Sequence, residues 1–275
     1  MTPLRTEKFF RAVDLVKTFE GIVALKHINI DVAQGEVVGL VGDNGAGKST
    51  FVKLVSGVYR PDSGYFLING KKFERLTISD CQQLGITIVH QESTTADKQT
   101  IWRNVFLGKE LTYPLGFLKI NEMKRRTAEL LEGLGFVAER ATSPDNVLRN
   151  LSGGFRQGIQ LARALDFTAN LAILDEPTVG LSLAESQIVL DFVSKIKEKG
   201  KSVILISHNI YHLYPVADRF VILDRGSKVG EFLKKDMTID DMSRVLVSIA
   251  RTGHFPKEFE DKNIDSNPIV RSTYD

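Results

Sequence analysis

The sequence predicts an α/β fold with a mainly parallel sheet, an N-terminal antiparallel β subdomain and an inserted helical subdomain. The first observation is a set of five short, unbroken apolar runs at residues 37–41, 86–89, 171–174, 203–206 and 220–223. Such runs are typical of strands that are buried on both faces, as in a parallel sheet. The second observation is that helical patterns lie between several of these runs, and strands that alternate with helices indicate a doubly wound core.

The first part of the chain shows the alternation expected of antiparallel strands. Ile28, Ile30 and Val32 alternate with polar residues, which predicts a strand with one buried face. Residues 65–73 predict a hairpin, because Asn69-Gly70 supplies a two-residue turn that tolerates positive φ. These patterns predict the antiparallel subdomain.

Helices are predicted by a different spacing of apolar residues. Val189, Phe192, Val193 and Ile196 recur at the spacing of one helix face, and Gly200 stands where that helix should stop. Residues 92–165 lack apolar strand runs, and residues 121–133 in particular are rich in helix formers. We therefore expect this segment to form the inserted helical subdomain.

Length and composition set the broad class. The 275 residues suit one large domain or two tightly joined lobes. We expect a single domain over residues 8–245, followed by a polar extension over residues 246–275 that is mobile or loosely docked. The net charge of +2 argues against nucleic acid as a partner. Cys81 is the single cysteine, so we expect no intramolecular disulfide and a small buried side chain. No signal peptide or membrane span is predicted, so a membrane role would need another chain.

The strongest motif is Gly42-Asp43-Asn44-Gly45-Ala46-Gly47-Lys48-Ser49-Thr50, which matches the phosphate-binding pattern G-x-x-x-x-G-K-[ST]. Glycines let successive backbone N–H groups turn toward an anion, and the following helix points its positive end at the same place. Because an apolar strand leads into the loop, the motif predicts a P-loop NTPase core. The expected nucleotide-binding residues are Gly42, Asn44, Gly45, Ala46, Gly47, Lys48, Ser49 and Thr50. Lys48 would bind the β- and γ-phosphates, and Ser49 would ligate Mg²⁺.

Two adjacent acids follow the run at residues 171–174. Ligands of parallel sheets gather at the carboxyl ends of the strands, so this is a sensible place for catalytic side chains. Asp175 is expected to hold Mg²⁺ through its water shell, and Glu176 to polarise the attacking water. A solvated acidic turn is the ordinary alternative for such a pair when no phosphate loop precedes it.

A third motif narrows the choice among families of P-loop proteins. Leu151-Ser152-Gly153-Gly154-Phe155-Arg156-Gln157 precedes a predicted helix, with Ser152 as its N-cap. A capped helix start alone would explain Ser-Gly-Gly, but its place just before the Asp175-Glu176 strand resembles the signature motif of ATP-binding cassette (ABC) ATPases. This resemblance covers residues 12–230.

The resemblance implies roles for three further residues. Gln91 matches the family glutamine that contacts the metal and the lytic water, His208 matches the switch histidine, and Phe19 matches the aromatic that stacks on adenine. Each alone is more typical of an ordinary structural role. Two positions depart from the common pattern: Phe155 stands where many members have Gln, and Ser182 where many have an Asp that helps the two sites communicate.

The family's mechanism implies the expected partners. Two ATPase subunits would face each other head to tail, with Ser152, Gly153 and Gly154 of one closing over the γ-phosphate of ATP held by the other. ATP and Mg²⁺ are the expected cofactors. An integral membrane permease is the expected partner, with a periplasmic or extracellular solute-binding protein acting indirectly, and the chain would lie peripherally on the cytoplasmic face. An apolar helix face of Ile101, Trp102, Val105 and Phe106 would either dock on the permease or simply pack the helical subdomain.

Several stretches most resemble ATPases of bacterial monosaccharide importers of the ribose, xylose and fructose type. They are residues 41–50, Val89-His90-Gln91-Glu92, Ile206-Ser207-His208-Asn209 and Val216-Ala217-Asp218-Arg219. An importer of amino acids or another small solute remains an alternative, as does a soluble ABC ATPase outside transport. A non-catalytic regulatory module is disfavoured by the intact Lys48, Asp175, Glu176, Gln91 and His208.

Overall fold

The computed structural model describes residues 8–89, 95–133, 143–164 and 169–264. A six-stranded sheet forms its centre in the order β10-β9-β3-β8-β7-β6. The strands are β3 (Val37–Val41), β6 (Ile86–Val89), β7 (Leu171–Asp175), β8 (Ser202–Ser207), β9 (Arg219–Asp224) and β10 (Ser227–Leu233). All neighbours are parallel except β9 and β10, which form an antiparallel pair. Each predicted apolar run is a strand of this sheet, so the predicted α/β class is confirmed.

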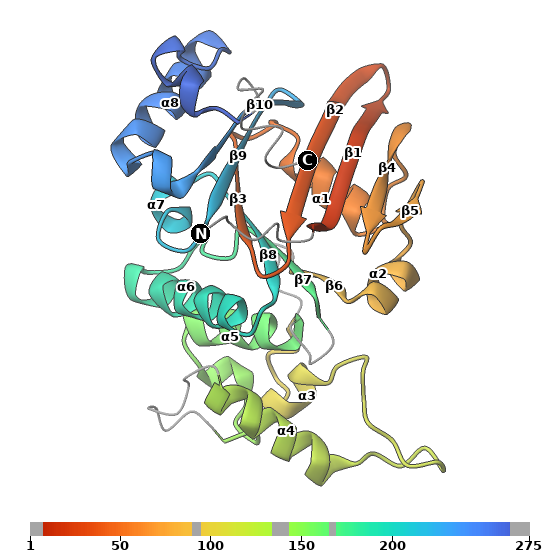
Figure 1. The fold of residues 1–275 in the computed structure, drawn as a ribbon. Helices are drawn as coiled ribbons and strands as arrows, with labels where there is room; N and C mark the ends of the chain where they lie inside the picture. The colour runs from red at the N-terminus through yellow and green to blue at the C-terminus, as the bar shows by residue number, and fades with distance from the viewer. Residues whose placement is uncertain (1–7, 90–94, 134–142, 165–168, 265–275) are drawn as a thin grey trace, which may run out of the picture.

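A second, antiparallel sheet lies beside the first, on the right in Figure 1. Its order is β2-β1-β4-β5, from β1 (Lys8–Phe19), β2 (Ile22–Ala33), β4 (Ser63–Ile68) and β5 (Lys71–Phe73). Asn69 and Gly70 both have positive φ, at 49° and 74°, as the predicted two-residue hairpin turn requires. Ile28, Ile30 and Val32 are buried, which confirms the predicted alternation in β2.

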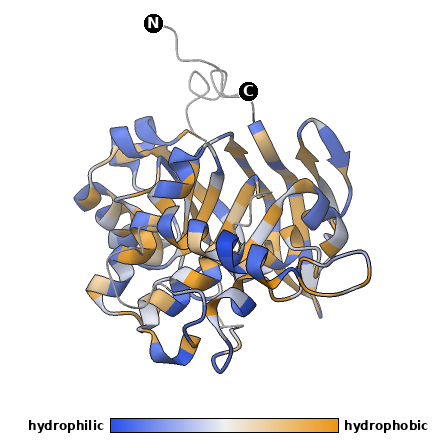
Figure 2. Cartoon of the chain, turned by 90° about the horizontal axis from the view of Figure 1, so that it is seen from below, coloured by the Kyte–Doolittle hydropathy of each residue, from blue (hydrophilic) through white to orange (hydrophobic). Residues whose placement is uncertain are grey.

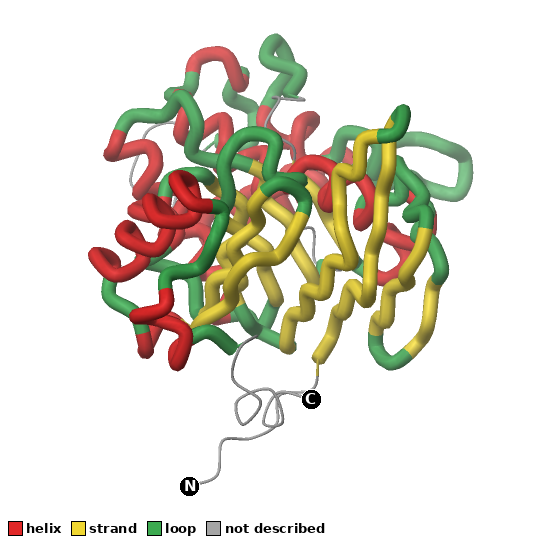
Figure 3. The backbone as a smooth tube through the Cα atoms, turned by 90° about the horizontal axis from the view of Figure 1, so that it is seen from above, coloured by secondary structure: helices red, strands yellow, loops and turns green. Residues whose placement is uncertain are grey.

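Helices pack against the parallel strands (Figure 3), and α1 contacts both sheets. They are α1 (Lys48–Val55), α2 (Ile78–Leu84), α3 (Ile101–Val105), α4 (Ile120–Gly133), α5 (Gly153–Ala164), α6 (Leu183–Glu198), α7 (Ile210–Leu213) and α8 (Ile239–Thr252). Short 3₁₀ turns are η2 (Leu148–Asn150), η3 (Lys234–Asp236) and η4 (Lys257–Lys262). Across the described residues, no helix combines the length and apolarity that crossing a bilayer requires.

The core consists of two apolar clusters, one on each face of the parallel sheet. One fills the space toward α5, α6 and α8, and the other lies between the sheet, α1 and the antiparallel strands. Figure 2 shows the hydrophobic strands enclosed by helices with polar outer faces. The predicted helix face of Val189, Phe192, Val193 and Ile196 is buried in the first cluster, and Cys81 is buried in the second.

Helices α3 and α4 form the lobe at the bottom of Figure 1. Ile101, Trp102, Val105 and Phe106 are all buried in the same cluster as the parallel sheet. Of the two interpretations of this helix face, packing of the lobe is therefore correct and docking on a partner is wrong. The spacing of apolar residues in so short a helix does not show whether its apolar face points into the protein or toward a partner.

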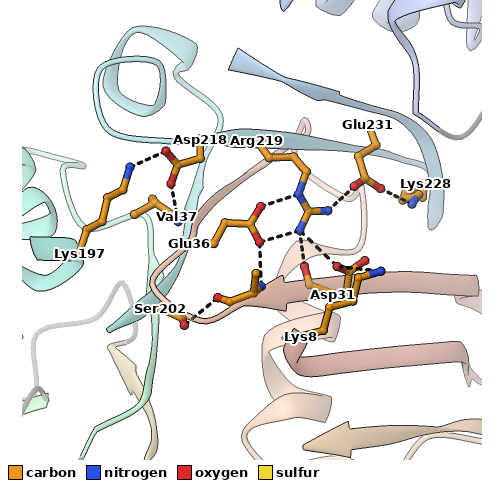
Figure 4. Close-up of polar contacts among 11 residues, drawn as sticks. Lys8, Asp31, Glu36, Val37, Lys197, Ser202, Asp218, Arg219, Lys228 and Glu231 are labelled. Carbon is orange, nitrogen blue, oxygen red and sulfur yellow. Dashed lines mark hydrogen bonds and ion pairs between the residues drawn. The ribbon is translucent and has the colours of Figure 1, made fainter. Parts of the chain in front are cut away.

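A buried arginine joins the two sheets (Figure 4). Arg219, whose side chain is 3% exposed, donates two hydrogen bonds to Glu36, at 2.7 and 3.0 Å, and one of 2.6 Å to the carbonyl of Asp31 on β2. It also pairs with Glu231 on β10. Burial alone would lower the pKa of the guanidinium, but the charges of Glu36, Glu231 and Asp31 hold it above its ordinary value. The arginine therefore stays charged and fixes β9 against the antiparallel sheet.

The expected boundary between residues 245 and 246 falls inside α8. Beyond this helix, Phe259 and Ile264 are buried, and the Asn263 side chain accepts a 2.9 Å hydrogen bond from the Glu231 amide. The Ile264 amide donates to the Glu231 carbonyl at 2.7 Å. The chain after α8 thus packs on β10 as far as Ile264.

Candidate functional site

The candidate site lies at the carboxyl edge of the parallel sheet. Val41 at the end of β3 pairs with Ser207 at the end of β8, and Asp175 at the end of β7 pairs with Ile206. This register brings the residues that follow three neighbouring strands to one edge, as predicted for ligands of parallel sheets. Gln91 follows the adjacent β6 in sequence and lies outside the described residues.

The phosphate loop connects β3 to α1 and borders a pocket of about 480 Å³. The pocket is lined by Asn44, Gly45, Gly47, Lys48, Ser49 and Thr50, whereas Gly42 and Ala46 are buried and do not line it. Gly47 has a φ of 106°, and a Cβ there would lie 2.6 Å from a methyl of Leu25, so only glycine fits this turn.

Lys48 is the buried cation of this pocket. Its Nζ donates to the carbonyls of Gly42 at 2.5 Å and Asp43 at 3.0 Å. These bonds hold the ammonium against the loop, where an anion bound on the loop amides would meet its charge.

Sequence reasoning missed part of the pocket wall. Ile22, Val23, Ala24 and Lys26 reach it from β2, and Arg225 reaches it from the turn between β9 and β10. The turn is fastened to the loop, because the Gly226 amide donates to the Ala46 carbonyl at 3.0 Å and the Gly226 carbonyl accepts from Lys26 at 2.7 Å. No local motif marks these residues; they arrive through tertiary packing.

Phe19 lies next to this wall in sequence but is not one of the residues that line the pocket. Its ring packs edge-on against Tyr59 with centroids 5.2 Å apart, and the Lys17 ammonium lies 5.3 Å from its centroid. Ile22 and Val23, both exposed, are the large apolar side chains that face the pocket.

Glu176 is held in an unusual backbone conformation directly after β7. Its φ is 51° and it is 8% exposed, and a non-glycine residue with positive φ at a strand end often marks a functional site. Its carboxylate accepts hydrogen bonds from the His208 amide at 3.0 Å and the Ser207 hydroxyl at 3.2 Å. The His208 ring nitrogen Nδ1 lies 2.9 Å from the same carboxylate. The structure therefore brings two predicted catalytic residues into direct contact.

A second histidine lies near this pair. His212 on α7 contacts the Thr178 hydroxyl at 2.8 Å, just after the acidic pair. Burial lowers its pKa, and the nearby His208 lowers it further, so His212 is neutral near pH 7. The sequence offers no signal for this residue beyond its place one turn after His208.

Of the three side chains expected to hold Mg²⁺, Gln91 lies outside the described residues, and the other two are a hydroxyl and a carboxylate. Ser49 lines the pocket at the start of α1, and Asp175 ends β7. Among the described residues, no group of three or more His, Cys, Asp and Glu side chains could hold a metal. One or two hard oxygen ligands fit Mg²⁺, which keeps several waters and takes its other ligands from phosphates.

The signature residues lie apart from this pocket. Ser152, Gly153 and Gly154 are absent from the described residues that line it, although they begin α5 as predicted. The Ser152 hydroxyl accepts from the Phe155 amide at 3.4 Å, so Ser152 is the N-cap. Phe155 is buried in the main core cluster, which explains a large apolar residue at this position.

The sequence model of a family described as ABC transporter matches residues 25–179 of the chain. This chain belongs to the ABC transporter family. The ABC cassette is 37% identical over 237 residues to the xylose/arabinose import ATP-binding protein XylG of Sulfolobus acidocaldarius, covering 86% of this chain and 93% of that relative.

A further relative of the cassette is a putative ribose/galactose/methyl galactoside import ATP-binding protein of Hahella chejuensis. The identity is 32% over 252 residues, covering 92% of this chain but 48% of the relative, so the chain spans about half of that protein. Among solved structures, the ADP conformation of MJ1267, an ATP-binding cassette of an ABC transporter, has a TM-score of 0.74 at 22% identity and covers 98% of this chain and 99% of its own. A dimeric post-hydrolysis state of MJ0796 bound to ADP and Pi has a TM-score of 0.69 at 25% identity, covering 82% and 98%. The cassette is a nucleotide-binding ATPase of this family.

Proposed function

We propose that the cassette powers the import of a monosaccharide, lying peripherally on the cytoplasmic side of a membrane against a permease. The observation that carries the sugar class is the identity of 37% over nearly the whole length of a relative named for xylose and arabinose import. The resemblance of residues 41–50 and 206–209 to sugar-importer ATPases supports the same class. An importer of another small solute is the alternative.

The proposed chemistry follows from the edge of the parallel sheet. Lys48 and the loop amides would bind the phosphates of ATP, and Ser49, Asp175 and Gln91 would hold Mg²⁺. Bound Mg²⁺ would neutralise charge on the phosphate oxygens. Glu176 would accept a proton from the attacking water, with its carboxylate oriented by Ser207 and His208.

We further propose that two copies form two composite ATP sites. Ser152, Gly153 and Gly154 lie apart from the phosphate pocket of their own chain, so they would contact nucleotide only on another copy. The dimeric MJ0796 cassette with ADP and Pi supports this arrangement. Closure would place N–H donors where negative charge develops and would exclude water.

A hairpin between α3 and α4 is the proposed permease contact on the lobe. The segment projects away from the body (Figure 1), with Leu115 86% exposed and Phe117 72% exposed. Its backbone is fixed by hydrogen bonds from Tyr113 to the Phe117 carbonyl at 2.8 Å and from Gly116 to the Tyr113 carbonyl at 2.9 Å. A rigid tip that displays large apolar side chains is typical of an interaction site. This replaces the buried α3 face as the proposed docking surface.

Gentle extraction of the full-length cassette from its source membranes tests the transport assignment. We expect a polytopic permease to co-purify, and ATP hydrolysis in reconstituted vesicles to rise with a sugar-loaded binding protein. Leu115→Ser with Phe117→Ser should abolish co-purification while ATP binding stays intact. Stimulation by an amino acid instead of a sugar would establish the alternative, and recovery without a permease would contradict the transport role.

Glu176→Gln tests the catalytic assignment. Loss of the proposed base should lower the hydrolysis rate by about 10²–10⁴-fold, the usual range for a general base. ATP binding, measured with a fluorescent analogue, should be unchanged, and the variant should accumulate as an ATP-bound dimer. Full turnover by this variant would exclude Glu176 as the base.

A further inference from the structure

We infer that the Glu185 carboxylate occupies an anion-binding position on Ser152, Gly153 and Gly154 of its own chain, which we call the signature loop. This carboxylate must leave the Gly154 amide before the partner's ATP can bind there. Glu185 would thereby set the ATP concentration at which two cassettes close on each other. The inference rests on the proposed composite site.

The contact joins the first turns of two helices. Glu185 stands three residues after Ser182, the N-cap of α6, and its Oε2 accepts from the Ser182 amide at 3.0 Å and from the Ser182 hydroxyl at 2.9 Å. These bonds complete a capping box. The other oxygen, Oε1, accepts from the Gly154 amide of α5 at 3.0 Å. One carboxylate therefore caps its own helix and binds the signature loop.

The length of the Glu185 side chain makes the second bond possible. Within the described residues, α2 and α8 also begin with complete capping boxes, and both use the shorter Asp at this place, Asp80 and Asp241. An Asp thus suffices for a cap in this protein. Glutamate at α6 adds reach, and the added reach is used on Gly154.

The glycines of the signature loop make room for this carboxylate. A Cβ at Gly154 would lie 2.7 Å from the Glu185 Cβ, closer than two such atoms approach. A Cβ at Gly153 would lie 3.1 Å from Oε1. Hydrogen bonds from Gly154 and Ser182 lower the pKa of Glu185 to about 2, so the group is an anion at physiological pH.

An amide carries one hydrogen, and two anions cannot share it without repulsion. The signature glycines are expected to donate to the γ-phosphate of ATP on the partner, so Oε1 and that phosphate compete for the Gly154 amide. Because Oε2 is bound to the amide and hydroxyl of Ser182, displacement of Oε1 is transmitted to Ser182 at the start of α6. Binding of the partner's ATP would thereby affect the segment that follows Glu176, through the side chain of Glu185.

The test measures ATP-driven dimerisation of the chain in the Glu176→Gln background. Sedimentation reports the fraction of dimer as ATP is titrated. Adding Glu185→Gln removes the negative charge. Adding Glu185→Asp keeps the charge and the helix cap, but its shorter side chain holds the carboxylate away from the Gly154 amide. Both should lower the ATP concentration at half-dimerisation by roughly 2- to 5-fold, the range for one charge contact in a partly exposed site. Glu198→Gln, which removes a charge from the exposed end of α6, is the matched control and should not shift it.

An unchanged or higher ATP requirement in both Glu185 variants would overturn the inference, because a purely structural role predicts that result. Melting temperature identifies a variant that fails to fold, and Glu185→Asp retains the capping arrangement seen in α2 and α8. Failure of the parent to bind ATP or to dimerise would instead overturn the proposed function, and this inference with it.

Discussion

Helices α1 and α5 both begin at glycine-rich segments: α1 follows the phosphate loop, and α5 has Gly153 and Gly154 as its first residues. Both point several backbone N–H groups and a positive helix end in one direction. The start of α1 is completed by a buried cation, Lys48, whereas the start of α5 is completed by a carboxylate, Glu185. The difference teaches that glycines and a helix N-terminus do not by themselves determine the affinity of a site for an anion. The charge of the side chain that contacts them determines it.

Among the substitutions that test this comparison of α1 and α5, the largest effect is expected from removing the cation at α1. Lys48→Ala should weaken ATP binding by about 10- to 100-fold, because charged hydrogen bonds contribute about 1.5–3 kcal/mol. Titration with a fluorescent ATP analogue measures the affinity. Lys53→Ala, which changes an exposed lysine of the same helix, is the control and should bind normally. Equal affinity in both variants would remove Lys48 from the phosphate site.

The packing of the α5 start is tested by a pair of neighbouring substitutions. Gly154→Ala should destabilise the fold by about 1–3 kcal/mol, the usual cost of overpacking, since its Cβ would lie 2.7 Å from the Cβ of Glu185. Gly153→Ala should cost less, because its Cβ meets the end of a flexible side chain at 3.1 Å. Urea denaturation measures both, and an equal loss in the two variants would argue against close contact at Gly154.

The capping box beside the signature loop should give a smaller effect. Ser182→Ala should lower the free energy of unfolding by about 1 kcal/mol, as loss of an N-cap usually does. Thr238→Ala removes the equivalent cap of α8 and should cost a similar amount. The two should differ in function: Ser182→Ala should alter ATP-driven dimerisation and Thr238→Ala should not. If the two variants dimerise at the same ATP concentration, Ser182 has no role in ATP-driven dimerisation.

The smallest expected effect is a dependence of stability on pH. Hydrogen bonds from Gly154 and Ser182 lower the pKa of Glu185 from 4.5 to about 2, so its ionised form stabilises the folded state. That stabilisation is fully present above pH 4.5 and is lost as pH falls toward 2. The stability advantage of the wild type over Glu185→Gln should therefore shrink across this window in denaturant titrations. A constant difference would mean that the carboxylate is not held by these bonds.

The sequence by itself determined the parallel strands and the main catalytic edge. Unbroken apolar runs identify doubly buried strands, and the residues at their carboxyl ends must meet once neighbouring strands are parallel. Gly42, Glu176 and His208 each come one or two residues after such a run, so their place at one edge of the sheet was predictable from the sequence. The strand order then brings Glu176 and His208 into contact. The hairpin at Asn69-Gly70 was predictable for a similar reason, since few residue pairs tolerate positive φ twice.

Only the tertiary structure decided which apolar and charged side chains face each other. The α3 face of Trp102 and Phe106 is buried, whereas Leu115 and Phe117 beyond it are exposed, although both segments are apolar in sequence. Arg225 reaches the phosphate pocket from the turn between β9 and β10, and no motif marks it. Glu185 reaches Gly154 from the first turn of α6, and its sequence pattern predicts only a capping box. Periodicity reports the local path of the backbone, but the charge that completes a binding site is set by long-range packing, which local spacing does not encode.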